Sequence, residues 1–122
     1  MRIGLFGGSF DPPHVGHHLA AVDAFEALQL DRLDFIPAAH QPLKPNGHAA
    51  SAAARVALLR AMVGDDARFS VNAIETDRGG LSFTVDTAES YQASGEGHSL
   101  FLLLGTDAAT RSGTFRAGGF RA

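Results

Sequence analysis

Two glycines and two histidines between residues 7 and 17 have the types and spacing that suit phosphate chemistry. Gly7 and Gly8 end a short apolar run, and because they lack Cβ atoms their backbone can turn sharply and approach a ligand closely. His14 and His17 lie three residues apart, so both rings would share one face of a helix that has begun by then. The start of such a helix also offers unsatisfied N–H groups and a positive dipole end. Together these features favour the binding of an anion.

Two other interpretations of residues 7–17 remain open. The segment could be a structural turn from strand to helix whose histidines face solvent. Alternatively, His14 and His17 could chelate a metal ion, with Asp11 as the obvious third ligand and no cysteine in the chain to assist. His18, which follows this pair, is expected on the helix surface.

The elements that must position this segment are a strand, a helix and a second strand. Residues 2–6 are mostly apolar and predict a buried parallel strand. Apolar positions three and four apart indicate an amphipathic helix over residues 15–30, and residues 33–36 predict a strand that Pro37 stops. This order makes a right-handed βαβ unit the default. The apolar positions of the helix are Val15, Leu19, Val22, Phe25 and Leu28.

A long irregular loop is predicted over residues 37–50, which contain three prolines. It would leave the same edge of the sheet as the histidine segment, where open α/β sheets bind ligands. A second helix is predicted over residues 52–63, with Ser51 as its N-cap and Gly64 at its C-terminal end.

The later part of the chain predicts two more strands and one more helix. Residues 69–73 alternate between apolar and polar and indicate a weaker strand. A helix can begin at Ser82 or Thr84 and run to about residue 93. Residues 100–104 are the most apolar run of the chain and predict a central strand. The glycine-rich residues after it predict neither a further strand nor a further helix.

The length of the chain fits a single domain. The chain has 122 residues, of which 45% are hydrophobic and 19% charged, and its net charge of −3 gives no basic surface for nucleic acid. The absence of cysteine excludes disulfides, thiolate catalysis and cysteine-ligated metals. Its first apolar run is too short for a signal peptide or a membrane span. We therefore expect a cytoplasmic protein with no membrane partner.

The run His14-Val15-Gly16-His17 resembles the HxGH signature of the nucleotidyltransferase superfamily. The longer segment of residues 7–14 is similar to the bacterial nicotinate-nucleotide adenylyltransferases. This resemblance implies a Rossmann-like, doubly wound parallel sheet. It also implies transfer of AMP from ATP to nicotinate mononucleotide, giving deamido-NAD and pyrophosphate in NAD biosynthesis, with Mg²⁺ bound at the ATP phosphates. His14 and His17 would be the catalytic pair that contacts the triphosphate.

The same resemblance implies two sets of binding residues. The ATP set includes a Gly-x-Asp at the end of the central strand. The nicotinate mononucleotide set includes a Ser-Phe-Thr that is similar to the family's Ser-Tyr-Thr. The residues implied in ATP binding are Gly7, Gly8, Ser9, Phe10, His14, Gly16, His17, Gly105 and Asp107. Those implied in binding nicotinate mononucleotide are Lys44, Ser82, Phe83, Thr84 and Phe115.

The implied reaction needs no protein nucleophile, because a mononucleotide phosphate is already largely a dianion at neutral pH. Positioning and charge neutralisation are then the whole catalytic task. The sequence agrees, since it contains no G-x-x-x-x-G-K-[ST] loop and no G-x-G-x-x-G after its first strand. These absences disfavour a P-loop phosphotransferase and a dinucleotide dehydrogenase.

The resemblance covers residues 1–110, and residues 111–122 form a divergent tail without the family's Ser/Thr-rich motif and arginine. The sequence therefore predicts an incomplete nucleotidyltransferase domain whose sheet is truncated after the fourth strand. The edge of residues 100–104 would then be exposed, so we expect self-association through it and low turnover. The alternatives are a non-catalytic or truncated nucleotide-binding module, and another adenylyltransferase such as the pantetheine-phosphate enzyme.

Overall fold

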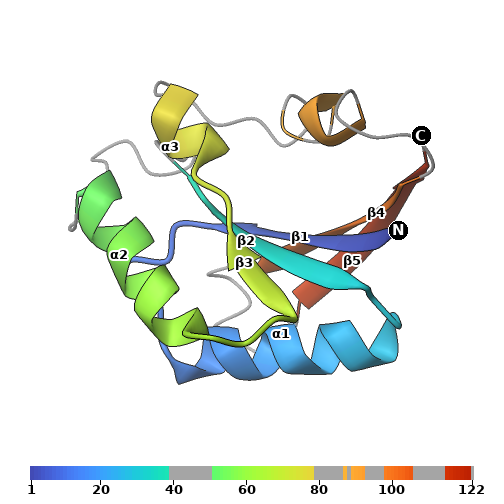
Figure 1. Ribbon diagram of the computed structural model, residues 1–122, viewed down its shortest axis with the longest axis horizontal. Helices are drawn as coiled ribbons and strands as arrows, with labels where there is room; N and C mark the ends of the chain where they lie inside the picture. The colour runs from blue at the N-terminus through green and yellow to red at the C-terminus, as the bar shows by residue number, and fades with distance from the viewer. Residues whose placement is uncertain (39–50, 79–86, 88, 93–97, 106–114, 122) are drawn as a thin grey trace.

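Five strands form one sheet at the centre of the protein, and helices lie on both of its faces (Figure 1). This computed structural model describes residues 1–38, 51–78, 87, 89–92, 98–105 and 115–121. The strands are ordered β3-β2-β1-β4-β5, with β1 to β4 parallel and β5 antiparallel to β4. Their bounds are β1 Arg2–Gly8, β2 Arg32–Pro37, β3 Phe69–Val71, β4 Ser99–Gly105 and β5 Phe115–Arg121, and the helices are α1 Val15–Ala27, α2 Ala52–Val63 and α3 Ile74–Arg78.

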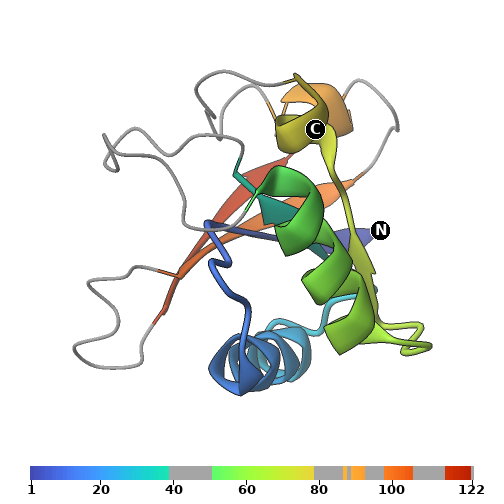
Figure 2. The same ribbon diagram turned by 90° about the vertical axis from the view of Figure 1, so that its left-hand side faces the viewer.

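The two faces of the sheet support separate cores. On one face, Phe6 packs in a cluster with Ala24 of α1 and Leu59 of α2. On the other face, Leu5 packs with Tyr91. Because Leu5 and Phe6 are neighbours in β1, the pleat sends their side chains to opposite faces. Figure 2 shows α1 and α3 on opposite sides of the sheet. The predicted doubly wound α/β fold is confirmed.

Helix α2 has the bounds that the sequence predicts. The Ser51 hydroxyl accepts a hydrogen bond from the Ala54 N–H at 3.1 Å, which satisfies one of the unpaired donors of the first turn. At the other end, Gly64 takes a φ of 57°, a left-handed conformation that a glycine adopts without steric cost. Both predicted caps of this helix are confirmed.

Helix α1 packs through small residues rather than through the predicted apolar stripe. Ala21 and Ala24 are fully buried, whereas Val15 is 71% and Leu19 60% exposed. A helix that meets the sheet through alanines can lie close to it, and this rotates the larger apolar residues of the first turns toward solvent. The predicted stripe is therefore wrong at its N-terminal end, although Phe25 and Leu28 still pack against the core.

The neighbourhood of α1 corrects two further expectations. His18 is half-buried rather than on the surface, and its ring meets Phe69 edge-on at 5.7 Å between centroids. The helix ends at Ala27 instead of residue 30. Gln29 adopts a left-handed φ of 51°, and the Arg2 guanidinium donates to the carbonyls of Leu28 and Gln29. These contacts end the helix early.

A fifth strand corrects the predicted truncation of the sheet. Strand β5 pairs along β4 from Ser99 opposite Arg121 to Gly105 opposite Phe115. The expectation of an exposed edge at β4 is therefore wrong, while self-association of the chain stays a prediction. The glycine-rich segment has no helical period, but an extended chain that follows an apolar strand gains by pairing with its unsatisfied backbone groups.

Two other elements differ from the sequence prediction. Strand β3 is shorter than residues 69–73, and the short helix α3, which the sequence analysis did not predict, follows it. The predicted helix over residues 82–93 is described only at residue 87 and residues 89–92, which are helical. Among the described residues, no helix has the length and apolar character to cross a membrane.

A buried carboxylate fastens this last helix to the sheet. Asp34 of β2 is 2% exposed and accepts hydrogen bonds from the Tyr91 hydroxyl at 2.7 Å and from the Ser70 hydroxyl. Arg32 pairs with the same carboxylate at 2.9 Å, and the Asn72 side-chain amide donates to the Tyr91 oxygen at 2.7 Å. The network satisfies a charge that would be costly to bury alone.

We expect Tyr91 to make stability depend on alkaline pH. Burial, with Asp34 beside it, raises the pKa of Tyr91 above its ordinary value. Above about pH 10 the unfolded chain loses this proton while the folded chain keeps it, so the free energy of unfolding falls as pH rises, by up to about 1.4 kcal/mol per unit. Urea unfolding between pH 8 and pH 11 measures this slope. Tyr91→Phe should make the free energy of unfolding depend less on pH. A slope equal to that of the unmodified chain would contradict the raised pKa of Tyr91.

Gly4→Ala is expected to lower the free energy of unfolding by about 1–3 kcal/mol. A Cβ atom at Gly4 would lie 2.5 Å from Leu30 Cδ1 and 3.2 Å from Leu103 Cδ1, and both leucines are buried. Gly7→Ala in the same strand is the matched control, because a Cβ there meets nothing within 4 Å. Urea unfolding compares the two variants, and equal stability would contradict the close packing around Gly4.

Candidate nucleotide-binding site

The site lies at the carboxyl end of β1, where the order of strands reverses. Residue Gly8 is in register with Pro37 of β2 on one side, and Gly7 is in register with Leu104 of β4 on the other. The Ala38 N–H donates to the Gly8 carbonyl at 2.8 Å and extends the ladder beyond β2. Open α/β sheets bind ligands at this kind of switch point.

His14 and His17 form a reciprocal cap at the start of α1. His14 is the N-cap residue, and its Nδ1 accepts a hydrogen bond from the Gly16 N–H at 3.0 Å. His17 Nδ1 accepts in turn from the His14 N–H at 3.0 Å. The two ring centroids are 4.0 Å apart. The predicted juxtaposition of the two histidines on one helix face is confirmed.

These hydrogen bonds fix the tautomer of both neutral rings. A nitrogen that accepts a hydrogen bond carries no proton, so the remaining proton of each imidazole is on Nε2. His14 and His17 thus present two N–H donors side by side at the N-terminus of a helix, whose dipole favours negative charge. This arrangement can bind an anion such as a phosphate.

Phe10 supports the histidines from inside the core. Its ring is 2% exposed and lies edge-on to His17 at 5.0 Å and to Phe6 at 5.5 Å between centroids. The backbone of Phe10 has a φ of 49°, a left-handed conformation that is uncommon for a residue with a side chain. Any contact of Phe10 with a nucleotide would therefore come from its backbone.

Two glycines of the segment matter for space around the site: Gly7 lies beside open space, and Gly16 lies against the His14 ring. At Gly7 a Cβ atom would meet nothing within 4 Å, so the space beside this backbone is open. At Gly16 a Cβ atom would lie 2.8 Å from His14 Cε1 and 2.9 Å from His14 Nδ1. The glycine at position 16 thus lets the His14 ring fold over the first turn.

Arg55 of α2 is part of this region, and the sequence analysis missed it. Its side chain is 1% exposed, and its Nη1 donates to the carbonyls of Ser9 at 2.9 Å and Ala38 at 2.6 Å. A signal was available, because Arg55 lies on the same helical face as the buried residues Leu59 and Val63. A charge on the apolar face of a helix needs a buried partner.

The remaining predicted site residues are placed in part. Gly105 is the last residue of β4 and follows Leu104, which is in register with Gly7. Phe115 of β5 is in register with Gly105, so the backbones of Gly105 and Phe115 reach the same edge of the sheet as Gly7. The other predicted residues lie outside the described part of the chain, and they are Lys44, Ser82, Phe83, Thr84 and Asp107.

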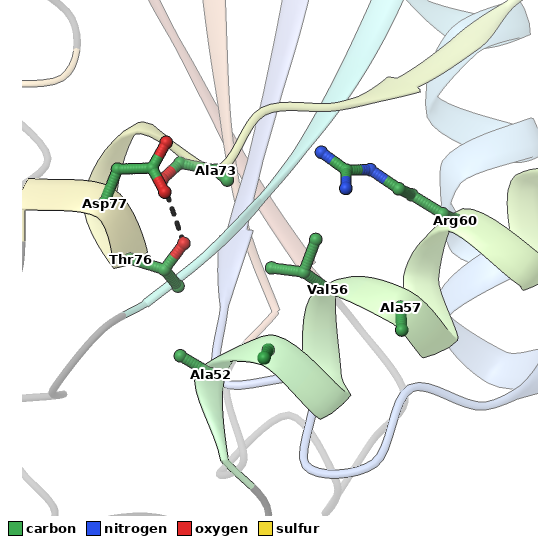
Figure 3. A pocket seen from close by; sticks show the side chains of 8 residues that line it. Ala52, Val56, Ala57, Arg60, Ala73, Thr76 and Asp77 are labelled. Carbon is green, nitrogen blue, oxygen red and sulfur yellow. Dashed lines mark hydrogen bonds between the residues drawn. The ribbon is translucent and has the colours of Figure 1, made fainter.

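A separate pocket of about 350 Å³ lies between α2 and α3 (Figure 3). Small residues of α2 form its floor, while Arg60 and Asp77 approach it from opposite sides. The Thr76 hydroxyl in its wall is held by the Ala73 carbonyl at 2.9 Å. None of the predicted site residues lines this pocket.

Comparison with known proteins agrees with this fold. A family model described as cytidylyltransferase-like matches residues 5–114. The chain is 54% identical over 107 residues to a probable nicotinate-nucleotide adenylyltransferase of Gemmatimonas aurantiaca, covering 88% of this chain and 50% of that protein. A probable nicotinate-nucleotide adenylyltransferase of Opitutus terrae is 49% identical over 107 residues, and the match covers 88% of this chain and 55% of that protein. The chain thus spans about half the length of the curated relatives it matches.

Two solved structures share the fold. Plasmodium falciparum nicotinic acid mononucleotide adenylyltransferase complexed with NaAD matches with a TM-score of 0.72 at 12% identity, covering 94% of this chain and 57% of that one. A putative nicotinate-nucleotide adenylyltransferase from Vibrio parahaemolyticus matches with a TM-score of 0.65 at 18% identity, covering 94% and 67%. With the family model matched over residues 5–114, the chain belongs to the cytidylyltransferase-like family of nucleotidyltransferases.

Proposed function

We propose that this chain supplies the ATP-binding part of a nicotinate-nucleotide adenylyltransferase. The observation that carries the proposal is the pair of Nε2 donors that His14 and His17 present together at the start of α1. The choice of nicotinate mononucleotide as the acceptor is supported by the names of the relatives. Since these enzymes act on small nucleotides and ATP, we also propose a cytoplasmic location.

In the proposed reaction, a phosphate oxygen of nicotinate mononucleotide attacks the α-phosphorus of ATP. A new oxygen–phosphorus bond forms, the bond to the β-phosphate breaks, and pyrophosphate leaves with its electron pair. The attacking phosphate has a second pKa near 6, so at neutral pH it needs no general base. The protein has to align the two phosphates and offset their charge.

The two histidines have different surroundings that suit this task. His17 is half-buried and held by the Phe10 ring, so its donor is fixed in direction, whereas His14 is exposed. A fixed donor gains most when charge develops on the phosphoryl oxygens in the transition state. We therefore assign transition-state stabilisation chiefly to His17, and binding of the triphosphate to His14 and the N–H groups of α1.

We propose that Mg²⁺ enters as part of the substrate, bound to the ATP phosphates. Mg²⁺ prefers oxygen ligands and keeps several of its waters, which suits phosphates. Among the residues that the structure describes, no group of three or more His, Cys, Asp or Glu side chains could hold a metal. When bound, the ion would offset the negative charge of the phosphates. Lys44, Ser82, Phe83, Thr84, Asp107 and Phe115 remain predicted contacts of the two substrates.

A chimera tests the proposed function. In the Gemmatimonas relative, the 107 aligned residues are replaced by those of this chain, which are 54% identical to them. The chimera is expected to form deamido-NAD and pyrophosphate from MgATP and nicotinate mononucleotide. Titration of the 122-residue chain with MgATP should also perturb the amide signals of residues 7–17. A folded chimera that prefers pantetheine phosphate, or that binds ATP without turnover, would contradict the proposal.

In this chimera, His17→Ala is expected to lower kcat by on the order of 10² to 10³ with a modest change in the KM for ATP. The reason is that the lost donor acts mainly in the transition state. His18→Gln is the control on the same helix, because the His18 ring packs on Phe69 instead of joining the pair. Steady-state pyrophosphate release measures both variants. An effect on KM alone would make His17 a ground-state binder.

Gly16→Ala is expected to weaken MgATP binding by roughly tenfold with little net change in stability, because the helix propensity that alanine adds offsets the loss of the His14 cap. Alanine favours the helix by about 1 kcal/mol over glycine, yet its Cβ would lie 2.8 Å from His14 Cε1 and push the ring aside. Val15→Ala is the control, because Val15 is 71% exposed. Isothermal titration with MgATP and thermal unfolding separate the two effects. Unchanged affinity of Gly16→Ala would show that the position of the His14 ring does not matter.

A further inference from the structure

Arg55 is a fully buried cation that makes no ion pair among the described residues. It comes from α2, far along the chain from the histidine segment, and the Nη1 atom alone bridges the backbone of two loops. One acceptor is the carbonyl of Ser9, after β1, and the other is the carbonyl of Ala38, after β2. Its Nε is buried and has no hydrogen-bond partner among the described residues.

The hydrogen bond from Arg55 to the Ser9 carbonyl also sets the direction of the Phe10 N–H. The Ser9 carbonyl and the Phe10 N–H belong to the same peptide unit, which is planar and trans, so the two groups point in opposite directions. When Arg55 holds the carbonyl on the side of α2, it aims the Phe10 N–H away from α2. The orientation of this donor is therefore set by a side chain that lies 46 residues away in sequence.

The backbone around this peptide needs such a restraint. Phe10 has a φ of 49°, a strained conformation that persists only where the surroundings impose it. Its buried ring fixes one side of the residue, and the Arg55 bond fixes the other. Successive N–H groups near a left-handed residue form a concave site that suits anions.

A stability role alone explains Arg55 poorly. Desolvation by burial lowers the pKa of its guanidinium, with Asp11 nearby acting in the opposite direction, so burial works against the charged form. Apolar residues of similar volume are often as stabilising as a buried charge, or more so. A buried cation beside an anion-binding loop does more, because it both orients the loop and adds positive potential.

We propose that Arg55 is a positioning residue for phosphate binding, which holds the peptide between Ser9 and Phe10 so that its N–H faces the ATP phosphates. The inference rests on the proposed function, since it takes the anion at residues 7–17 to be a nucleotide phosphate. Arg55 itself touches no reacting atom in this proposal.

The experiment uses the 122-residue chain with MgATP and, separately, inorganic pyrophosphate as probes. Arg55→Met keeps an unbranched, flexible side chain, but it ends two bonds short of the position of Nη1 and removes the donors. Arg60→Met is the matched control, because Arg60 is an exposed arginine of the same helix. Dissociation constants are measured by isothermal titration well below the melting temperature of each variant, and amide spectra report the signals of Ser9 and Phe10.

Arg55→Met is expected to bind both probes at least tenfold more weakly while it remains folded, with the Phe10 amide signal shifted. Arg60→Met should bind like the unmodified chain. A role in stability alone would lower the melting temperature and leave the dissociation constants unchanged, which would overturn the inference.

Arg55→Lys covers the case in which Arg55→Met does not fold. The ammonium keeps the charge, but it is one bond shorter than the guanidinium nitrogen that reaches both carbonyls. We expect binding several-fold weaker than that of the unmodified chain, and equal binding by a folded Arg55→Lys variant would overturn the inference. If the unmodified chain binds neither probe at residues 7–17, the proposed function itself fails.

Discussion

Two reciprocal hydrogen bonds at the first turn of α1 set the geometry on which the candidate site depends. Each of the two histidines uses Nδ1 to satisfy a backbone N–H that a helix N-terminus would otherwise leave unpaired. The same bonds put both ring protons on Nε2 and hold the rings 4.0 Å apart. Nδ1 caps the helix and Nε2 is the proposed donor to an anion, so both tasks use the same two rings and a change in ring position affects both.

The segment before α1 is held from behind by packing and by a buried charge. Phe10 fills the space under His17, and Arg55 ties the loop after β1 to the loop after β2. Both restraints act on groups that are buried, whereas the space beside Gly7 is open. An anion can therefore approach a backbone whose conformation is already fixed, and this lowers the entropic cost of binding.

The position of β1 in the sheet explains why the site forms where it does. With β2 on one side and β4 on the other, the carboxyl ends of three parallel strands meet at the reversal of strand order. On the face of Tyr91, the Asp34 network fastens a helix to β2 and β3 by hydrogen bonds as well as by apolar contact. The strands that flank the site are thus supported from both faces.

Much of this arrangement could be predicted from sequence because it is local. The glycines after β1, the histidine spacing, and the Ser51 and Gly64 caps each depend on residues a few positions apart. The parallel strands follow from short apolar runs between predicted helices, and a motif of this length specifies the family as well. These features identify the fold class and the candidate anion site without reference to distant contacts.

Other features depended on which surfaces meet in the folded chain. Val15 and Leu19 fit a helical apolar stripe, but the sheet is met by Ala21 and Ala24, which allow a closer approach. Strand β5 lacks a strong pattern of its own and is defined by pairing with β4. Arg55 shows the same limit, since its partners are carbonyls of two other loops. The sequence by itself determined the local chemistry, whereas the tertiary structure decided burial and long-range pairing, because these arise only between segments far apart in the chain.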